Sequence, residues 1–255
     1  MKLLTINTHS HIEDNYEEKC DIFIETINRI EPDIMAMQEV NQTKNSKIVY
    51  GYKDIKEDNH ALKIYKKLKN YHFSWLKIKS GYEIYEEGLA VFSKKPISDM
   101  SELLLTNTDD FNNWKKRMAQ IVKIDDLVIS NVHMGWWNDL EEPFSDQFEK
   151  LNNYLSPIND TVFIMGDFNS PANESGTGYD MVLSHGWYDT YTLADKKDSG
   201  NTITKKIAGW ENDGDSKRID YIFTNKKLDI KSSKVIFDGN NEKIISDHNG
   251  VIIEI

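Results

Sequence analysis

The stretch Phe163-Ile164-Met165-Gly166-Asp167-Phe168-Asn169 decides the fold of this chain. An apolar run that ends in Gly-Asp-Phe-Asn predicts a buried strand followed by a polar turn. A second stretch, Ser246-Asp247-His248-Asn249, precedes a final apolar strand. Side chains at strand ends can converge from distant parts of a sheet. An Asp that holds a water, an Asn that holds a phosphate and a His that neutralises charge would suit metal-assisted attack on a phosphate ester.

Hydrophobic periodicity on both sides of these stretches predicts further helices and strands. Asn15 is expected to cap the first helix and Pro32 to end it. The predicted helices cover residues 16–30, 61–68, 140–155 and 175–184, and the predicted strands cover residues 5–7, 34–39, 71–78, 88–93, 120–124, 127–133, 161–166, 219–224, 233–237 and 250–255. A strand, helix, strand passage opens each half of the chain. This order predicts one domain over residues 1–255, in which helices flank two packed sheets.

The composition is that of a soluble globular protein. Of the 255 residues, 39% are hydrophobic and 29% are charged. No stretch approaches the ~20 apolar residues of a membrane span. The N-terminal apolar run is very short and turns polar after Ile6, which predicts a strand and not a signal peptide. The single Cys20 lies on an apolar helix face, so a buried, inert thiol is expected. Together these features predict a cytoplasmic protein.

The net charge bears on the class of substrate. The chain has 31 basic and 42 acidic residues, which gives a net charge of −11. Lysine clusters occur at residues 66–69, 115–117 and 226–227, but acidic residues are scattered among them. Proteins that grip a long polyanion usually present a basic face. Nucleic acid is therefore the less favoured partner.

Acidic, amide and imidazole side chains recur at the predicted strand ends. They are Asn7, Glu39, His133, Asp167, Asn169, Asp220, Asp247 and His248. The ordered motifs Gln38-Glu39-Val40, Gly166-Asp167-Phe168-Asn169 and Ser246-Asp247-His248 resemble those of the endonuclease/exonuclease/phosphatase superfamily. That superfamily holds deoxyribonuclease I, exonuclease III, inositol polyphosphate 5-phosphatases and neutral sphingomyelinases. The resemblance runs over nearly the whole chain. It implies a four-layered α/β-sandwich of two packed mixed β-sheets flanked by helices, which hydrolyses a phosphate ester with a divalent cation.

The resemblance also implies a metal site. Glu39 would be the main ligand, with Asn7 and Asp247 close by. Such oxygen ligands suit Mg²⁺, with Mn²⁺ as a substitute. Many nuclease members carry an acid two residues after Asn7, where this chain has His9. His9 and His11 alternate along an expected extended segment, so one of them would reach the site, and His9 is the candidate for substrate binding.

The remaining roles implied by the resemblance belong to the reaction itself. Asp167 would orient or deprotonate the attacking water, and Asn169 would hydrogen-bond a phosphoryl oxygen. His248 would be a cationic or donor partner to the phosphate, with Asp220 accepting from its other nitrogen. His133 would contact the phosphate or the leaving oxygen.

Each of these residues also has a purely structural interpretation. Asp167 and Asn169 could simply form a turn, since both residue types favour turns. Glu39 and Asp247 could be surface acids, and His133 could be a core imidazole. The ordered set of motifs at strand ends favours the functional interpretation.

Aromatic residues near the expected site indicate the kind of substrate. Trp136 and Trp137 could stack a sugar ring or a base, or one of them could be core. The segments 114–117, 133–137, 141–144, 209–211 and 218–221 resemble bacterial maltose 6′-phosphate phosphatases. This resemblance implies a phosphomonoesterase that acts on a sugar phosphate. Trp136, Trp137 and Trp210 would bind the sugar, and Lys115 or Arg117 would neutralise the phosphate.

Other functions stay open at the level of the sequence. A nuclease of the exonuclease III or deoxyribonuclease I type would share the catalytic residues, but the acidic balance argues against it. A lipid or inositol phosphatase would need exposed apolar loops beside a basic patch. A non-catalytic binding module would not need the complete set of catalytic residues. The polar loops 41–59 and 195–217 are long enough to act as lids.

Overall fold

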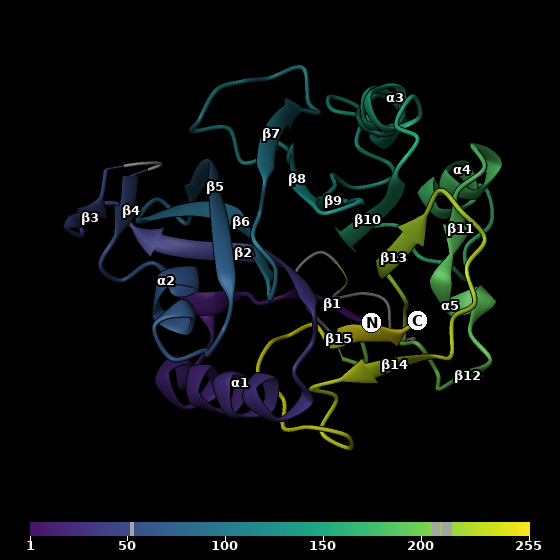
Figure 1. Cartoon of the computed structure of the whole chain (residues 1–255). Helices are drawn as coiled ribbons and strands as arrows, with labels where there is room; N and C mark the ends of the chain where they lie inside the picture. The colour runs from purple at the N-terminus through teal and green to yellow at the C-terminus, as the bar shows by residue number, and fades with distance from the viewer. Residues whose placement is uncertain (52–53, 206–209, 211–215) are drawn as a thin grey trace.

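Two mixed β-sheets lie face to face in the computed structural model, which describes residues 1–51, 54–205, 210 and 216–255 (Figure 1). The strands of sheet 1 follow the order β12-β14-β15-β1-β2-β6-β5, and those of sheet 2 follow the order β11-β13-β10-β9-β8-β7. Sheet 1 consists of β1 (Lys2–Asn7), β2 (Ile34–Thr43), β5 (His72–Gly81), β6 (Tyr85–Ser93), β12 (Lys196–Lys197), β14 (Ser232–Ile236) and β15 (Gly250–Glu254). Sheet 2 consists of β7 (Asp99–Leu104), β8 (Met118–Ile124), β9 (Leu127–His133), β10 (Thr161–Asp167), β11 (Tyr188–Asp189) and β13 (Asp220–Thr224).

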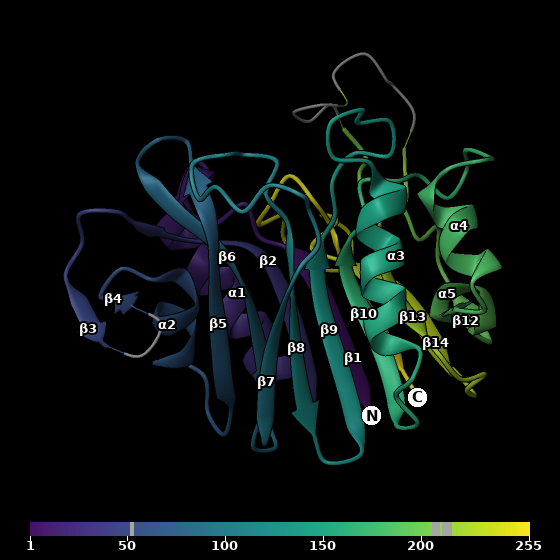
Figure 2. The same cartoon turned by 90° about the horizontal axis from the view of Figure 1, so that it is seen from above.

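Helices cover the outer faces of the two sheets (Figures 1 and 2). They are α1 (Tyr16–Ile30), α2 (His60–Tyr65), α3 (Phe144–Leu155), α4 (Gly178–Ser184) and α5 (Thr190–Leu193), with a 3₁₀ turn, η1 (Ser10–Ile12). Phe23 of α1 packs in one core with Leu4 of β1, on the outer face of sheet 1. Phe148 of α3 packs with Ile164 of β10, on the outer face of sheet 2. The expected four-layered α/β-sandwich is confirmed.

The alternation of side chains along the central strands explains the layers. Leu4 and Ile6 of β1 face α1, whereas Leu3 belongs to the core between the sheets. Phe163 and Met165 of β10 occupy that same core from the opposite sheet. Since successive side chains of a strand point to opposite faces, a continuous apolar run is buried on both sides.

The two halves of the chain contain matching parallel units. β1 pairs in parallel with β2 across α1, and β9 pairs in parallel with β10 across α3. In a parallel pair, the carboxyl ends of both strands reach the same edge of the sheet. Asn7 ends β1, His133 ends β9 and Asp167 ends β10, and these three residues therefore lie at one end of the sandwich.

Several predicted boundaries are wrong. The helix expected over 140–155 begins at Phe144, because Asp139 Oδ1 accepts the N–H groups of Glu141 and Glu142 in a turn that ends at Pro143. The loop expected over 41–59 contains the end of β2 and the hairpin of β3 (Ile48–Tyr50) and β4 (Ile55–Lys56). The edge strand β7 is absent from the predictions, because it is at most half-buried and lacks an apolar run.

Local details near the N-terminus also differ from expectation. Asn15 has a left-handed backbone, with φ of 57°, and its side chain makes no capping hydrogen bond to α1. The segment after Asn7 turns into η1 instead of staying extended. Cys20 is buried as expected, and burial raises the pKa of its thiol to about 11.

Two further points concern the surface. Among the described residues, no helix is both long and apolar enough to cross a membrane. The proposed lid function of loops 41–59 and 195–217 stays a prediction, and residues 52–53, 206–209 and 211–215 lie outside the described residues.

Candidate active site

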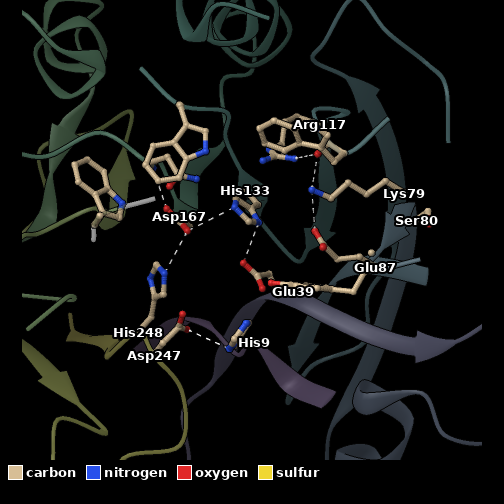
Figure 3. A pocket seen from close by; sticks show the side chains of 16 residues that line it. His9, Glu39, Lys79, Ser80, Glu87, Arg117, His133, Asp167, Asp247 and His248 are labelled. Atoms are coloured by element: carbon tan, nitrogen blue, oxygen red, sulfur yellow. Dashed lines mark hydrogen bonds and ion pairs between the residues drawn. The ribbon is translucent and has the colours of Figure 1, made fainter. Parts of the chain in front are cut away.

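The register of sheet 2 brings three predicted site residues side by side. Asp167 pairs with His133 of β9 on one side and with Asp220 of β13 on the other. His248 lies in the loop that leads into β15, and its Nδ1 lies 2.9 Å from Asp220 Oδ2. The Nε2 atoms of His133 and His248 lie 3.6 Å and 3.8 Å from Asp167 Oδ2. Figure 3 shows the two imidazoles on either side of the Asp167 carboxylate.

The turn after β10 fixes the positions of Asp167 and Asn169. Asn169 has a left-handed backbone, with φ of 46°, a conformation that Asn tolerates better than most residues. Its N–H group donates to Asp167 Oδ1 at 2.9 Å, and its Nδ2 donates to the carbonyl of Met134 at 3.0 Å. The Gly-Asp-Phe-Asn motif is therefore a turn, and it also presents two polar side chains to one cavity.

Glu39 enters the site through an irregularity in β2. The pairing of β2 with β6 shifts register between Met37 and Val40, and Glu39 has φ of 51°. Such bulges re-aim a side chain that regular alternation would send elsewhere. Asn7 Nδ2 donates to Glu39 Oε1 at 2.9 Å and to Asp167 Oδ2 at 3.1 Å, so this amide links sheet 1 to sheet 2.

Burial and neighbouring charges shift the pKa values of these groups. Burial and the negative charge of Asp220 raise the pKa of Asp167 to about 7. Burial opposes a charge on His248, but Asp220 and Asp167 together raise its pKa well above the ordinary value. Burial and the cations Arg117 and Lys79 lower the pKa of His133 well below the ordinary value. The surroundings therefore favour the protonated form of His248 and the neutral form of His133.

The donor set fits a hard divalent cation. Glu39, Asp167 and Asp247 contribute carboxylates to one cavity, and Asn7 lies behind them, with its Nδ2 donating to Glu39 and Asp167 and its Oδ1 accepting from the N–H group of His9. Burial and the nearby charge of Glu87 raise the pKa of Glu39, so a cation there would relieve an unfavourable buried charge. Oxygen atoms are the ligands that Mg²⁺ prefers.

A cavity of about 480 Å³ opens over these groups. Ten of the predicted site residues line it: His9, Glu39, Arg117, His133, Trp136, Asp167, Asn169, Trp210, Asp247 and His248. Asn7 and Asp220 are buried behind its wall and contact the lining residues by hydrogen bonds. The structure therefore brings twelve of the fourteen predicted residues to one place.

The other two predicted residues lie outside the cavity lining. Trp137 is partly buried and packs edge-on against Phe144 of the core on the outer face of sheet 2, with ring centroids 5.9 Å apart. Lys115 Nζ forms ion pairs with Asp139 at 2.8 Å and with Glu141 at 2.9 Å. The interpretation of one tryptophan as core agrees with the position of Trp137, whereas Trp136 lies against Trp210 with centroids 5.2 Å apart.

The two histidines after Asn7 do diverge. His9 lines the cavity, where its Nδ1 lies 2.7 Å from Glu13 Oε1 and 3.7 Å from Asp247 Oδ1. His11 instead stacks on Tyr16 of α1 at 4.4 Å. The divergence comes from the η1 turn and not from strand alternation.

The cavity also has lining residues that the sequence patterns do not single out. They are Lys79, Ser80, Gly81, Tyr82 and Glu87, and Trp114 of the segment 114–117 lines the cavity beside them. Lys79 and Glu87 are cross-strand partners in β5 and β6. Both residues lie just outside the predicted strands 71–78 and 88–93, so the sequence patterns gave no signal for them, and only the observed extent of β5 and β6 makes them cross-strand partners.

Comparisons with known proteins place this architecture in a family. The model of the Endonuclease/Exonuclease/phosphatase family matches residues 15–248. No curated protein gives a significant match. The solved structure of an endonuclease/exonuclease/phosphatase family protein from Leptotrichia buccalis C-1013-b is 36% identical, with a TM-score of 0.92 over 100% of this chain and 99% of that one.

Two more distant solved structures share the fold. A mannosyl-6-phosphatase from Bacteroides thetaiotaomicron VPI-5482 is 19% identical, with a TM-score of 0.72 over 100% of this chain and 98% of that one. A 3′ phosphatase from Neisseria, bound to a product DNA hairpin, is 18% identical, with a TM-score of 0.69 over 100% of this chain and 99% of that one. Together with the family match over most of its length, these similarities show that the chain belongs to the endonuclease/exonuclease/phosphatase family.

Proposed function

We propose that this protein is a Mg²⁺-dependent phosphomonoesterase that acts on a small phosphorylated sugar, such as maltose 6′-phosphate. The observation that carries the proposal is the composition of one cavity. Asp167, Asn169 and His248 share it with the aromatic pair Trp136 and Trp210. Indole faces bind the apolar faces of sugar rings, and the polar groups can bind a phosphate.

In this proposal, Glu39, Asn7 and Asp247 hold Mg²⁺, or Mn²⁺ as a substitute. The cation supplies positive charge near the phosphoryl and leaving oxygens when it is bound. Asp167 aligns a water for in-line attack and accepts a proton from it. Water attacks the phosphorus atom directly, and no phosphoenzyme forms.

Other side chains in this proposal stabilise the transferred group. Asn169 donates through its amide, and His248 donates through Nε2 while Asp220 keeps its ring charged. Arg117, which is buried beside the cavity, adds a fixed cation. Charge accumulates on the equatorial oxygens in a loose transition state, so donors fixed in advance lower the barrier. His133, whose lowered pKa favours the neutral ring, contacts the phosphate or the leaving oxygen.

Two observations favour a small substrate over a nucleic acid. The chain carries a net charge of −11, and the loop beside Trp136 carries Asp139, Glu141 and Glu142. Glu141 is exposed, although it pairs with Lys115, and would repel a flanking phosphodiester backbone, whereas Asp139 is held by Lys115 and Glu142 is buried. A mannosyl-6-phosphatase shares the fold, but so does a 3′ phosphatase bound to DNA. The alternative function is that of a nuclease or of an inositol or lipid phosphatase. We also propose that the protein is cytoplasmic and forms a single domain.

The deciding experiment measures phosphate release by the purified protein with Mg²⁺. Maltose 6′-phosphate, glucose 6-phosphate and inositol phosphates are compared, with nicking of plasmid DNA in parallel. We expect preferential release from the disaccharide phosphate that a chelator abolishes. DNA nicking without phosphate release would move the substrate to nucleic acid. Preferential release from inositol phosphates would overturn the sugar assignment.

A further inference from the structure

The wall of the cavity formed by β5 and β6 has no part in the reaction as proposed, yet it carries charged side chains. Lys79 and Glu87 face each other there, with Lys79 Nζ 3.2 Å from Glu87 Oε1. Lys79 Nζ also donates to the carbonyl of Trp114 at 2.8 Å. Figure 3 shows this pair on the opposite side of His133 from Asp167 and His248.

A β-bulge turns Lys79 into the cavity. Lys77 pairs with Gly88 and Lys79 pairs with Glu87, so Ile78 is an extra residue in β5. Lys77 and Lys79 would point to the same face of a regular strand. Instead, Lys77 Nζ lies 3.1 Å from Asp54 Oδ2 and outside the cavity lining, whereas Lys79 lines the cavity. Bulges next to a site commonly re-aim one side chain in this way.

The backbone at this bulge is closely packed. A Cβ atom on Gly88 would lie 2.0 Å from the carbonyl oxygen of Leu76, so only glycine allows β5 and β6 to approach here. Lys79 is 6% exposed, and burial and the charge of Arg117 lower its pKa to about 8. Keeping an ammonium in such a place is unfavourable unless its donors have partners.

We propose that Lys79 and Glu87, with Trp114, form a subsite that binds the hydroxyl groups of the sugar in the leaving group. This inference rests on the proposed function and adds residues to it. An in-line reaction puts the attacking water and the leaving oxygen on opposite sides of phosphorus. Since Asp167 holds the water in this proposal, the leaving oxygen lies on the far side of phosphorus, from which the part of the disaccharide that Trp136 and Trp210 do not hold can reach Lys79 and Glu87.

The chemistry of the pair selects the ligand class. The ammonium of Lys79 only donates hydrogen bonds, and the carboxylate of Glu87 only accepts them. Two neighbouring hydroxyl groups can accept from one and donate to the other at the same time. A second phosphate or carboxylate would instead meet the negative charge of Glu87. Trp114, which lines the cavity and is 56% exposed, offers an aromatic surface for the ring.

A second observation is one buried donor beside this wall that lacks a partner. Arg117 is buried, and its NH1 donates to the carbonyls of Trp114 and Lys116. Its Nε is buried and has no hydrogen-bond partner among the described residues. Buried donors are nearly always satisfied, so a ligand oxygen is the expected acceptor in the complex.

The test compares the substrate selectivity of variants with Mg²⁺ present. The kcat/KM for maltose 6′-phosphate is divided by that for phenyl phosphate, whose leaving group has no free hydroxyl. In Lys79→Met and Glu87→Gln we expect this ratio to fall by about tenfold or more, as expected for lost hydrogen bonds to charged groups. Lys79→Arg keeps a donor and should recover part of the ratio. Lys77→Met is the matched control, and its ratio should stay at the wild-type value.

Two results would overturn the subsite. One is an equal loss on both substrates, which would assign Lys79 to the phosphate or to the architecture of the site. The other is a wild-type ratio in both Lys79→Met and Glu87→Gln. Melting temperatures identify a variant that fails to fold. If either Lys79→Met or Glu87→Gln fails to fold, the ratio measured for the other variant tests the subsite.

A binding measurement separates this inference from the proposed function. Free maltose is titrated by calorimetry into the wild type, Lys79→Met, Glu87→Gln and Lys77→Met. Weaker binding in the first two variants alone supports the subsite, even if the wild type hydrolyses neither phosphate ester and the proposed function fails. Equal binding by all four proteins, or no binding by the wild type, would overturn the subsite.

Discussion

Asp220 influences the candidate site without lining the cavity. Its Oδ2 accepts from His248 Nδ1, and its Oδ1 is buried without a hydrogen-bond partner among the described residues. A charge in such surroundings acts on its neighbour with little screening from water. Asp220 therefore offsets the effect of burial on His248 and keeps that imidazole protonated.

Removing the charge of Asp220 should change the pH dependence of activity. In Asp220→Asn, the pKa of His248 should fall toward its ordinary value or below, because burial then acts without the opposing charge. His248 then loses its proton at a lower pH, so the alkaline limb of the pH profile of kcat/KM should shift to lower pH by about one pH unit or more. A pH profile measures this shift, with Asp229→Asn at an exposed position as the control. An unmoved alkaline limb would contradict the assigned role of Asp220.

Asp167 carries the central role in the proposed reaction. Asp167→Asn keeps the size of the side chain but removes the carboxylate that would align and deprotonate water. We expect turnover to fall by ~10²-fold or more. The circular dichroism spectrum should remain that of the wild type. Asp160→Asn, at the opposite end of β10, is the control and should keep full turnover. Wild-type turnover in Asp167→Asn would rule out this role.

At the scale of the element, close backbone contacts fix where the polar side chains emerge. Gly166 has φ of 149°, and a Cβ atom there would lie 1.9 Å from the carbonyl oxygen of Val132 in β9. β10 therefore approaches β9 closely just before Asp167. The same principle operates at Gly88 beside Lys79. In both places, glycine allows a strand contact that orients the neighbouring charged residue.

Gly166→Ala should separate β9 from β10 at the site. Strain and overpacking together should lower the free energy of unfolding by about 2 kcal/mol or more. Turnover should also fall, because Asp167 and His133 sit on the strands that must move apart. Denaturant unfolding measures the first effect. Gly51→Ala, where a Cβ atom meets nothing within 4 Å, should change stability by less than about 0.5 kcal/mol. Equal stabilities of the two variants would disprove the packing argument.

At the scale of the whole molecule, the sandwich gathers acidic groups at one end. The pKa values of Glu39 and Asp167 are raised, the latter to about 7. The folded state therefore binds these protons more tightly than the unfolded state does. Stability from these two groups is greatest at low pH and decreases as the pH rises from about 4 to 7. A cation that replaces the protons would reverse this loss.

Mg²⁺ should therefore stabilise the protein more at high pH than at low pH. We expect the rise in melting temperature on adding Mg²⁺ to be larger at about pH 8 than at about pH 5, because bound cation competes with protons. Thermal unfolding with Mg²⁺ or with a chelator measures the difference. Glu39→Gln should lose most of the Mg²⁺ effect at both pH values. An equal or larger rise at the lower pH would exclude this linkage.

Sequence periodicity predicts those elements whose faces are strongly apolar. The helix expected over 16–30 matches α1, because Phe23, Ile24 and Ile27 lie on one buried face. The edge strand β7 and the hairpin β3–β4 are missing from the predictions, because the side chains of β7 and β3 bury little and β4 has only two residues, too few to form a pattern. The helix start at Phe144 is mispredicted for a different reason. The side chain of Asp139 accepts the N–H groups of Glu141 and Glu142, which holds these residues in a turn instead of a helix.

The sequence by itself determined which chemical groups this protein brings to its site. Asp167 and Asn169 lie at the end of one strand, and Asp247 and His248 lie just before another, in an order that identifies the family, because strand ends can be recognised from local pattern. Only the tertiary structure decided that Trp137 packs against the core and that Lys79 faces the cavity. The reason is physical: a bulge or a turn reverses the side on which a residue emerges, and it depends on contacts with strands far away in the chain.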